Sequence, residues 1–174
     1  KRINEIKGLE RIRFVTSHPK DLSGKLILSF KQLNKLCEHI HLPLQSGSDT
    51  ILKKMNSVYS CQEYIDKIFA LRETVPQISI TSDIIVGFPE ETDDDFNNTV
   101  NIIKQITYDD LFIFHYTDRN GTKASTLKNK IPYKVKIERL TILNELQRKI
   151  SMDKNSKLIN KKVSVLFENT SKYD

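Results

Sequence analysis

Short apolar runs alternate with amphipathic segments along most of this chain, and this alternation restricts its fold more than any other feature. The runs at residues 11–15, 38–42, 78–86 and 111–116 each have the length expected of a strand. The segments between them carry apolar residues at helical spacing. Such an order favours right-handed crossovers and a parallel sheet. The sequence therefore predicts an α/β fold with four parallel strands, forming either a small open sheet or part of a larger barrel.

Local helix-start signals support this order. Ser60 and Glu63 stand in an S-x-x-E capping box, which predicts a helix that closes before Pro76. Thr92 with Asp95 is a second N-cap signal, with an apolar stripe behind it. Two further helices are expected over residues 22–36 and 50–55. The third predicted strand ends in Ile84-Ile85-Val86, which is apolar on both faces, as in a sheet covered on both sides.

Beyond the predicted sheet, residues 133–158 keep helical apolar spacing and predict one long helix. Residues 162–167 then alternate like a strand that has no partner earlier in the chain. A final strand of this kind predicts the start of a second, β-rich domain. Residues 128–162 hold 11 Lys or Arg against 3 Asp or Glu, in a chain of net charge +6. This stretch suits either a polyanion such as RNA or a well-solvated helix surface.

Composition and cysteine spacing exclude several classes of protein. In 174 residues there is no apolar run near the roughly 18 residues that a membrane span needs. The first ten residues, KRINEIKGLE, have no apolar signal-peptide region, so the expectation is a soluble cytoplasmic protein. Cys37 and Cys61 fit no zinc, iron–sulfur or redox spacing, and we interpret them as ordinary small apolar residues. The triplet Asp93–Asp95 is interpreted as first-turn charge that complements a helix dipole, not as a metal site.

Candidate binding residues lie at the predicted carboxyl ends of the strands, where ligands of parallel α/β folds bind. Gln45, Ser46 and Ser48 offer neutral donors and acceptors that suit ribose hydroxyls and an amino-acid carboxylate. Gly47 and Gly87 allow the backbone to approach a ligand closely. Together with the neighbouring loops, these residues predict a pocket for a nucleoside-like ligand; the loops span residues 16–19, 42–49, 86–92 and 116–122.

Less specific interpretations of the same residues stay open. One alternative for the segment Gln45–Ser48 is a helix-initiating turn without a binding role. His39 and His41 share one strand face, and packing or hydrogen bonding is the commoner role for such residues. His18 is either a base or an exposed loop residue, and Arg119 can face an anion.

Four segments, taken in order and at matching intervals, resemble the methylthiotransferase branch of the radical SAM superfamily. His18-Pro19-Lys20-Asp21 is closer to the branch that modifies tRNA than to the branch that modifies a ribosomal-protein aspartate. The four segments are RIRFVTSHPKDLS (11–23), EHIHLPLQSGSDTILKKMN (38–56), TSDIIVGFPEETDDDF (81–96) and FHYTDRNGT (114–122).

This resemblance implies a specific chemistry. In the family, S-adenosylmethionine (SAM) binds a [4Fe–4S] cluster, and its cleavage gives a 5′-deoxyadenosyl radical that activates C2 of N6-isopentenyladenosine in tRNA. Sulfur is then inserted, and a second SAM supplies the methyl group. The implied partners are tRNA, SAM and a reductant such as flavodoxin or ferredoxin. No membrane partner is implied.

The resemblance also assigns residues and domains. The substrate or adenine side is assigned to His18, Tyr116 and Arg119. Residues 1–158 resemble the later part of a radical SAM (TIM-like) parallel barrel, and residues 159–174 resemble the opening of an RNA-binding TRAM domain. The segments that meet SAM in the family correspond here to Gln45, Ser46, Gly47, Ser48, Asp83, Val86, Gly87 and Phe88.

The chain departs from the family pattern at several points. Glu90 stands where the family usually has a glycine, so a positive φ at this position would cost about 1 kcal/mol or more. Asn120 and Lys123 replace expected prolines. The family's CxxxCxxC cluster motif is missing, and Cys37 and Cys61 cannot replace it. The chain by itself is therefore expected to be inactive and to supply no metal ligand.

Two alternatives accompany the assignment to a tRNA methylthiotransferase. The first is the ribosomal-protein branch of the same family. The second is a non-catalytic RNA-binding module that uses the basic stretch.

Overall fold

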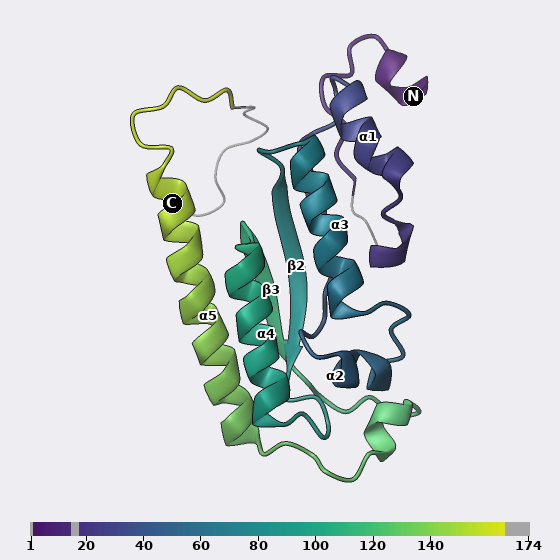
Figure 1. The fold of residues 1–174 in the computed structure, drawn as a ribbon, viewed down its shortest axis with the longest axis vertical. Helices are drawn as coiled ribbons and strands as arrows, with labels where there is room; N and C mark the ends of the chain where they lie inside the picture. The colour runs from purple at the N-terminus through teal and green to yellow at the C-terminus, as the bar shows by residue number, and fades with distance from the viewer. Residues whose placement is uncertain (1, 15–17, 166–174) are drawn as a thin grey trace.

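The computed structural model describes residues 2–14 and 18–165, and in this part of the chain three parallel strands form one sheet. They are β1 (His39–His41), β2 (Ser79–Val86) and β3 (Asp110–His115), in the order β1-β2-β3 (Figure 1). The α/β fold with a parallel sheet is thus confirmed. The fourth predicted strand, over residues 11–15, is wrong for its described residues, because only an isolated bridge joins Ile12 to Leu36.

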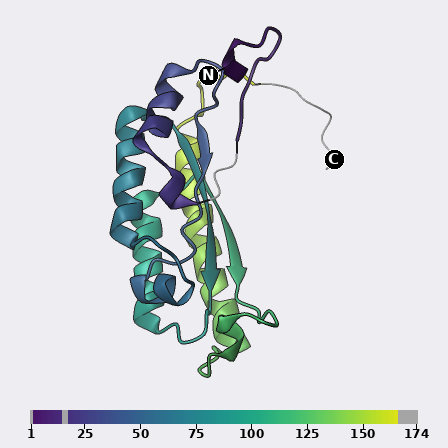
Figure 2. The same ribbon diagram turned by 90° about the vertical axis from the view of Figure 1, so that its right-hand side faces the viewer.

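The helices gather on one face of this sheet, as the edge-on view in Figure 2 shows. Each of the five predicted helical segments contains a helix, although the first is shorter than expected. Three short 3-10 helices join these elements in the described residues: η1 (Arg2–Glu5), η2 (Pro19–Asp21) and η3 (Lys123–Thr126). The α-helices are α1 (Gly24–Gln32), α2 (Asp49–Lys54), α3 (Cys61–Thr74), α4 (Asp93–Ile106) and α5 (Tyr133–Ser156).

The predicted capping box and the second predicted N-cap are both present. The Ser60 hydroxyl accepts a hydrogen bond from the backbone N–H of Glu63, and the Glu63 carboxylate accepts one from the N–H of Ser60, at the start of α3. Thr92 and Asp95 make the same reciprocal pair at the start of α4. These bonds satisfy backbone donors that a helix cannot satisfy itself, so both helices begin where the sequence predicts.

The core lies between the sheet and the helices. Side chains along β2 alternate strictly between buried and half-buried, and Ile84 and Val86 are fully buried under the helices. Ile85 lies on the opposite face and is only half-buried. On the same open face, Phe112 and Phe114 of β3 are 49% and 54% exposed. The expectation of a sheet covered on both faces is therefore wrong for the residues described.

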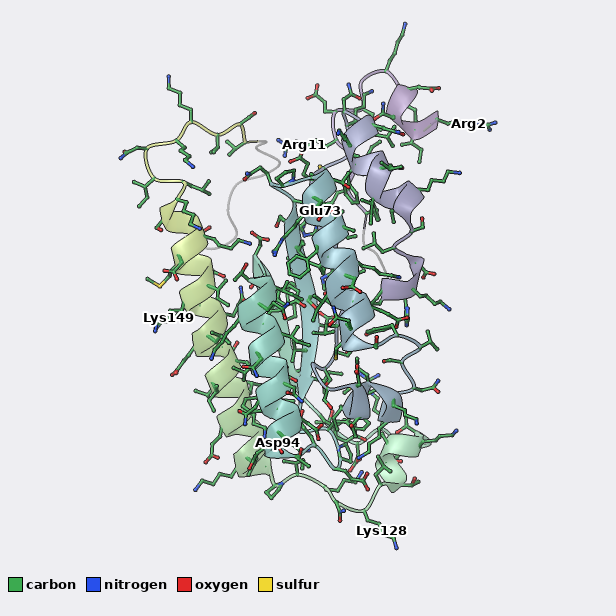
Figure 3. The ribbon with its side chains drawn as sticks, in the orientation of Figure 1. Arg2, Arg11, Glu73, Asp94, Lys128 and Lys149 are labelled. Carbon is green, nitrogen blue, oxygen red and sulfur yellow. The ribbon has the colours of Figure 1, made fainter. Side chains whose placement is uncertain are left out.

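Helix α5 runs antiparallel to the strands, and it begins at the end of the sheet where β2 and β3 end (Figure 1). Leu143 is fully buried, and Leu140, Leu146 and Ile150 pack against the core, which confirms the predicted apolar face. Outward-facing Lys149 points away from the helix and the sheet (Figure 3). Residues 161–165 form no strand, and the rest of the predicted strand over 162–167 lies outside the described residues.

No helix in the described part of the chain combines the length and apolar character that crossing a membrane requires.

Candidate functional site

A cavity of about 850 Å³ lies at the carboxyl ends of the strands. The segments that follow β1, β2 and β3 all contribute to its wall, together with His18 and Pro19. This arrangement follows from the parallel topology, because every strand of such a sheet ends at the same edge. Of the residues that the sequence singled out, the wall contains Gln45, Asp83, Phe88, His18, Tyr116 and Arg119.

Gln45 reaches the cavity because the chain continues along β2 after β1 ends. Its backbone N–H donates to the carbonyl of Asp83 at 2.8 Å, and its own carbonyl accepts from the N–H of Ile85 at 2.8 Å. These bonds place the three residues side by side on the wall. Gln45 has a φ of 71°, a left-handed conformation that non-glycine residues rarely adopt and that often marks functional sites.

Residues Ser46, Gly47 and Ser48 are buried and do not line the cavity. Ser48 caps α2 and donates a hydrogen bond to Asp95. A Cβ atom on Gly47 would lie 2.4 Å from the Cα of Thr99. The sequence predicted that Gly47 allows a ligand to approach the backbone; in this structure the close approach is made by α4 instead.

Gly87 also allows close packing. It has a φ of 69°, and a Cβ there would lie 2.4 Å from Cγ of Lys136. Its close neighbour is therefore the Lys136 side chain, not an open space for a ligand. Val86 belongs to the core, with no exposed surface. Phe88 does line the cavity, where its ring meets the Tyr116 ring edge-on at 5.1 Å between centroids.

Glu90 has a φ of 67°, so the position does require the conformation that its usual glycine provides. Its carboxylate forms an ion pair with Lys54 at 2.8 Å, and its backbone N–H donates to the carbonyl of Asn129 at 2.8 Å. The loop therefore keeps the left-handed conformation in spite of the side chain. A strain of about 1–2 kcal/mol is the expected consequence.

His18, Tyr116 and Arg119, which the resemblance assigns to the substrate side, come together on the cavity wall. The Nδ1 atom of His18 accepts the N–H of Lys20 at 3.2 Å, and its ring meets Tyr59 edge-on at 5.3 Å. The Tyr116 hydroxyl donates to Asp118 at 3.0 Å. Burial, and then the hydrogen bond to the Asp118 carboxylate, raises the pKa of Tyr116, which stays protonated near neutral pH.

Cationic side chains outnumber carboxylates on the wall. Among the described residues, Lys54, Arg119 and Lys123 line it, against the single carboxylate of Asp83. Aromatic rings from Tyr59, Phe88, Phe114 and Tyr116 supply flat apolar surface beside these charges. A ligand that combines a planar base with an anionic group fits this mixture.

Asp83 belongs to a polar row on the open face of the sheet. Its Oδ2 lies 3.4 Å from Nε2 of His41, whose Nδ1 is 2.9 Å from the Thr81 hydroxyl. His39 lies 3.3 Å from Arg13, and burial, followed by the charge of Arg13, lowers its pKa. Both histidines are therefore hydrogen-bonded strand residues, which is the commoner role considered for them from the sequence.

Sequence reasoning missed one side of the cavity. Lys54, Met55, Asn56 and Ser57 line it from the end of α2, and Tyr59 lies beside them. The Tyr59 hydroxyl donates to the carbonyl of Leu44 at 2.9 Å, and burial raises its pKa to about 12. Lys54, Met55 and Asn56 belong to the segment 38–56 that carries the family resemblance, but nothing in the sequence indicated that they line a cavity.

The described residues do not fit an iron–sulfur cluster. No group of three or more His, Cys, Asp or Glu among them could hold a metal ion. Burial raises the pKa of the Cys61 thiol to about 12, so it stays protonated and is a poor ligand. Cys37 is a second free cysteine. A nucleoside-like ligand such as SAM, by contrast, fits the aromatic and polar wall described above.

Comparison with known proteins gives consistent matches. Three similar sequences are the proteins named tRNA-2-methylthio-N(6)-dimethylallyladenosine synthase from Syntrophus aciditrophicus (51% identical over 170 residues), Thermodesulfovibrio yellowstonii (50% over 167) and Caldicellulosiruptor saccharolyticus (46% over 171). These alignments cover 96–98% of this chain but only 36–39% of those relatives. The chain thus spans less than two fifths of the length of the relatives it matches.

The fold also matches a solved structure. Coproporphyrinogen III oxidase from Escherichia coli, described as a radical SAM enzyme, superposes with a TM-score of 0.63 at 15% identity. The match covers 76% of this chain and 31% of that one, so it supports a partial fold of this type. The family model described as the radical SAM superfamily matches residues 1–103, more than half of the sequence. With the parallel sheet and the strand-end cavity, this match shows that the chain belongs to the radical SAM superfamily.

Proposed function

We propose that this chain is part of a tRNA methylthiotransferase whose strand-end cavity binds SAM. The observation that carries the proposal is the meeting of Gln45, Asp83 and Phe88 on one wall, at the sheet edge where ligands of such folds bind. The names of the relatives, whose alignments cover nearly the whole chain, supply the substrate class. The reaction would insert sulfur and a methyl group at C2 of N6-isopentenyladenosine in tRNA.

Within this proposal, the wall residues divide by chemistry. The Asp83 carboxylate and the Gln45 amide bind the ribose hydroxyls or the amino group of SAM. Phe88 and Tyr116 provide a surface for the adenine ring, and Arg119 attracts an anion. His18 lies on the same wall and is assigned to the substrate side. The wall is supported by the packing of residues that do not line the cavity: Ser46, Gly47, Ser48, Val86 and Gly87.

A [4Fe–4S] cluster would be held by residues outside those described here, and when bound it supplies the electron that cleaves SAM. The residues of this chain bind and orient SAM and exclude water from it. The proposal further includes tRNA and a reductant such as flavodoxin or ferredoxin as partners, and a cytoplasmic location. It also assigns residues 1–158 to the barrel and 159–174 to a TRAM domain.

The two alternatives are less well supported. For a non-catalytic RNA-binding module, the basic stretch must be free to meet RNA, yet several of its cations are used internally. Lys130 pairs with Asp118, Arg139 with Glu91, and Lys154 with Asp109. The ribosomal-protein branch shares the fold, but the relatives that match the chain at 44–51% identity are named for tRNA.

Substitution of Asp83 in the full-length protein tests the proposal. The Asp83→Asn variant keeps the shape of the side chain and removes its charge, and we expect SAM affinity to fall about tenfold, which is the contribution of one charged hydrogen bond. The matched control is Asp153→Asn on the exposed face of α5, which should bind SAM normally. Equilibrium dialysis with labelled SAM measures both.

Nucleoside analysis of tRNA from a deletion strain tests the activity itself. Loss of the 2-methylthio group, restored by the wild-type gene and poorly by the Asp83→Asn gene, is the expected result. Unchanged tRNA modification in the deletion strain would point to the ribosomal-protein branch instead. Salt-sensitive RNA binding without any binding of SAM would support the RNA-binding module.

A further inference from the structure

The first turns of α5 contact two of the loops that form the cavity. The contacts come from Lys136 and Arg139, and neither side chain lines the cavity itself. The Lys136 side chain covers Gly87 so closely that a Cβ atom there would lie 2.4 Å from Lys136 Cγ. Its ammonium group continues to the other loop, where it donates to the carbonyl of Tyr116 at 2.8 Å. It also lies 5.3 Å above the centre of the Tyr116 ring. One side chain thus joins the loops that follow β2 and β3.

Arg139, one turn further along α5, holds the loop after β2 by a second route. Arg139 is 5% exposed, and its Nη1 lies 2.5 Å from Oε2 of Glu91, which is 3% exposed. The same Oε2 accepts the backbone N–H of Gly87 at 2.7 Å. The other arm of the guanidinium binds Asp93 at 2.7 Å. The guanidinium therefore acts on Gly87 through one carboxylate, directly beside Phe88 on the wall.

This loop needs such support. Glu90 has a positive φ of 67°, and a residue other than glycine keeps such a conformation only where its surroundings hold it. Burial raises the pKa of Glu91, against the opposing effects of the Gly87 N–H and Arg139. Without the guanidinium, the ionised carboxylate that holds Gly87 would be buried alone, which is unfavourable.

We propose that Lys136 and Arg139 are positioning residues for SAM, because they hold Phe88 and Tyr116 in the arrangement that receives the ligand. The proposal rests on the function proposed above. It also gives two cations of the basic stretch a role that does not involve RNA. Their site of action is the loop pair at the start of α5, which lies at the end of the sheet where the strands end (Figure 1).

Helix α5 contains a matched control for this proposal. Lys154 ties the other end of the helix to the sheet, with an ion pair to Asp109 at 2.7 Å and a hydrogen bond to the carbonyl of Thr107 at 2.9 Å. Asp109 immediately precedes β3, so this tie lies at the opposite end of the sheet from the cavity. Lys154 thus fastens the same helix without touching a cavity loop.

The experiment compares Lys136→Met, Arg139→Lys and Lys154→Met in the full-length protein. Methionine keeps an apolar stem over Gly87 and removes the ammonium group, and lysine keeps the charge of Arg139 without its fork. We expect SAM affinity to fall about tenfold in the first two variants, the equivalent of one charge-assisted hydrogen bond, and to change less than twofold in Lys154→Met. Equilibrium dialysis measures the affinities, and circular dichroism verifies that each variant is folded.

Hydrogen exchange without ligand is a second readout that does not depend on SAM. Amides over residues 84–92 should exchange faster in the Lys136 and Arg139 variants and at the wild-type rate in Lys154→Met. Wild-type SAM affinity in all three variants, or the same loss of SAM affinity in all three, would overturn the positioning role while leaving the proposed function intact. A wild-type protein that binds no SAM would overturn both.

Discussion

The hydroxyl group of Ser48 donates a hydrogen bond to Oδ1 of Asp95 across 2.5 Å, between residues 47 positions apart in the chain. The same hydroxyl oxygen accepts the N–H of Ile51 and caps α2, while Oδ2 of Asp95 accepts the N–H of Thr92 and caps α4. Both residues are buried. One contact therefore couples two helix starts and fixes the segment that brings Gln45 to the cavity.

Replacing Ser48 by alanine removes a cap and leaves Oδ1 of Asp95 without its donor. We expect Ser48→Ala to lower the free energy of unfolding by about 2 kcal/mol, measured by denaturant titration of the purified protein. Ser23→Ala is the control, because the Ser23 hydroxyl caps α1 by accepting an exposed hydrogen bond from the N–H of Leu26. An equal loss in both variants would mean that the bond to Asp95 contributes nothing beyond the cap.

Asp95 should also contribute to acid sensitivity. Burial opposes its ionisation, but hydrogen bonds from Ser48 and Thr92 outweigh this and lower its pKa from the usual 3.8. Its contribution to stability is therefore present above pH 3.8 and is lost as the pH falls through the lower folded pKa. Unfolding titrations of wild type and Asp95→Asn across this range should differ in slope, with the variant less dependent on pH. Parallel pH profiles would contradict the assignment.

Glu90 is a position where a natural side chain costs stability. Its φ of 67° is unfavourable for any residue with a Cβ, whereas its ion pair with Lys54 is partly exposed. Since such a pair contributes at most about 1 kcal/mol and the strain costs about 1–2 kcal/mol, Glu90→Gly should be neutral or stabilising by up to 1 kcal/mol. Glu90→Gln keeps the strain and loses the pair, so it should be less stable than Glu90→Gly in thermal unfolding. The reverse order would show that the ion pair outweighs the strain.

Gly47 should not tolerate a side chain. A Cβ atom there meets the backbone of α4 at 2.4 Å, and separating the packed elements costs about 1–3 kcal/mol. Gly24 provides the comparison, because it stands at the first residue of α1 with open space around it. We expect Gly47→Ala to lower the melting temperature clearly and Gly24→Ala to leave it unchanged or slightly raised. A tolerated Gly47→Ala would show that α4 can move.

Much of the local structure followed from the sequence because its signals are local. A capping box such as Ser60 with Glu63 needs only residues three positions apart, and the helix start it predicted is present. The strand ends followed equally well, since Pro43 and Gly87 interrupt apolar runs within a few residues. The failed strand at 11–15 differs because strand pairing depends on a neighbour distant in the chain. Ile12 meets Leu36 at a single bridge.

Which side chains line the cavity could not be predicted in the same way. The sequence treated Gln45, Ser46, Gly47 and Ser48 as one binding segment, yet only Gln45 lines the cavity. Alternation alone does not say which face the helices cover, because that depends on where α4 packs. Likewise, the basic stretch resembled a solvated or RNA-binding surface, and only the packed structure links Arg139 to Glu91.

By itself, the sequence determined the kinds of element, most of their limits and the edge of the sheet at which polar loops gather. Periodicity, caps and turn residues act within a few positions, so a linear pattern is enough to predict them. Only the tertiary structure decided that Gly47 makes room for a helix, that Glu90 is strained, and that α5 holds the cavity loops. Those outcomes depend on contacts between residues dozens of positions apart, whose distances and burial arise when the elements pack together.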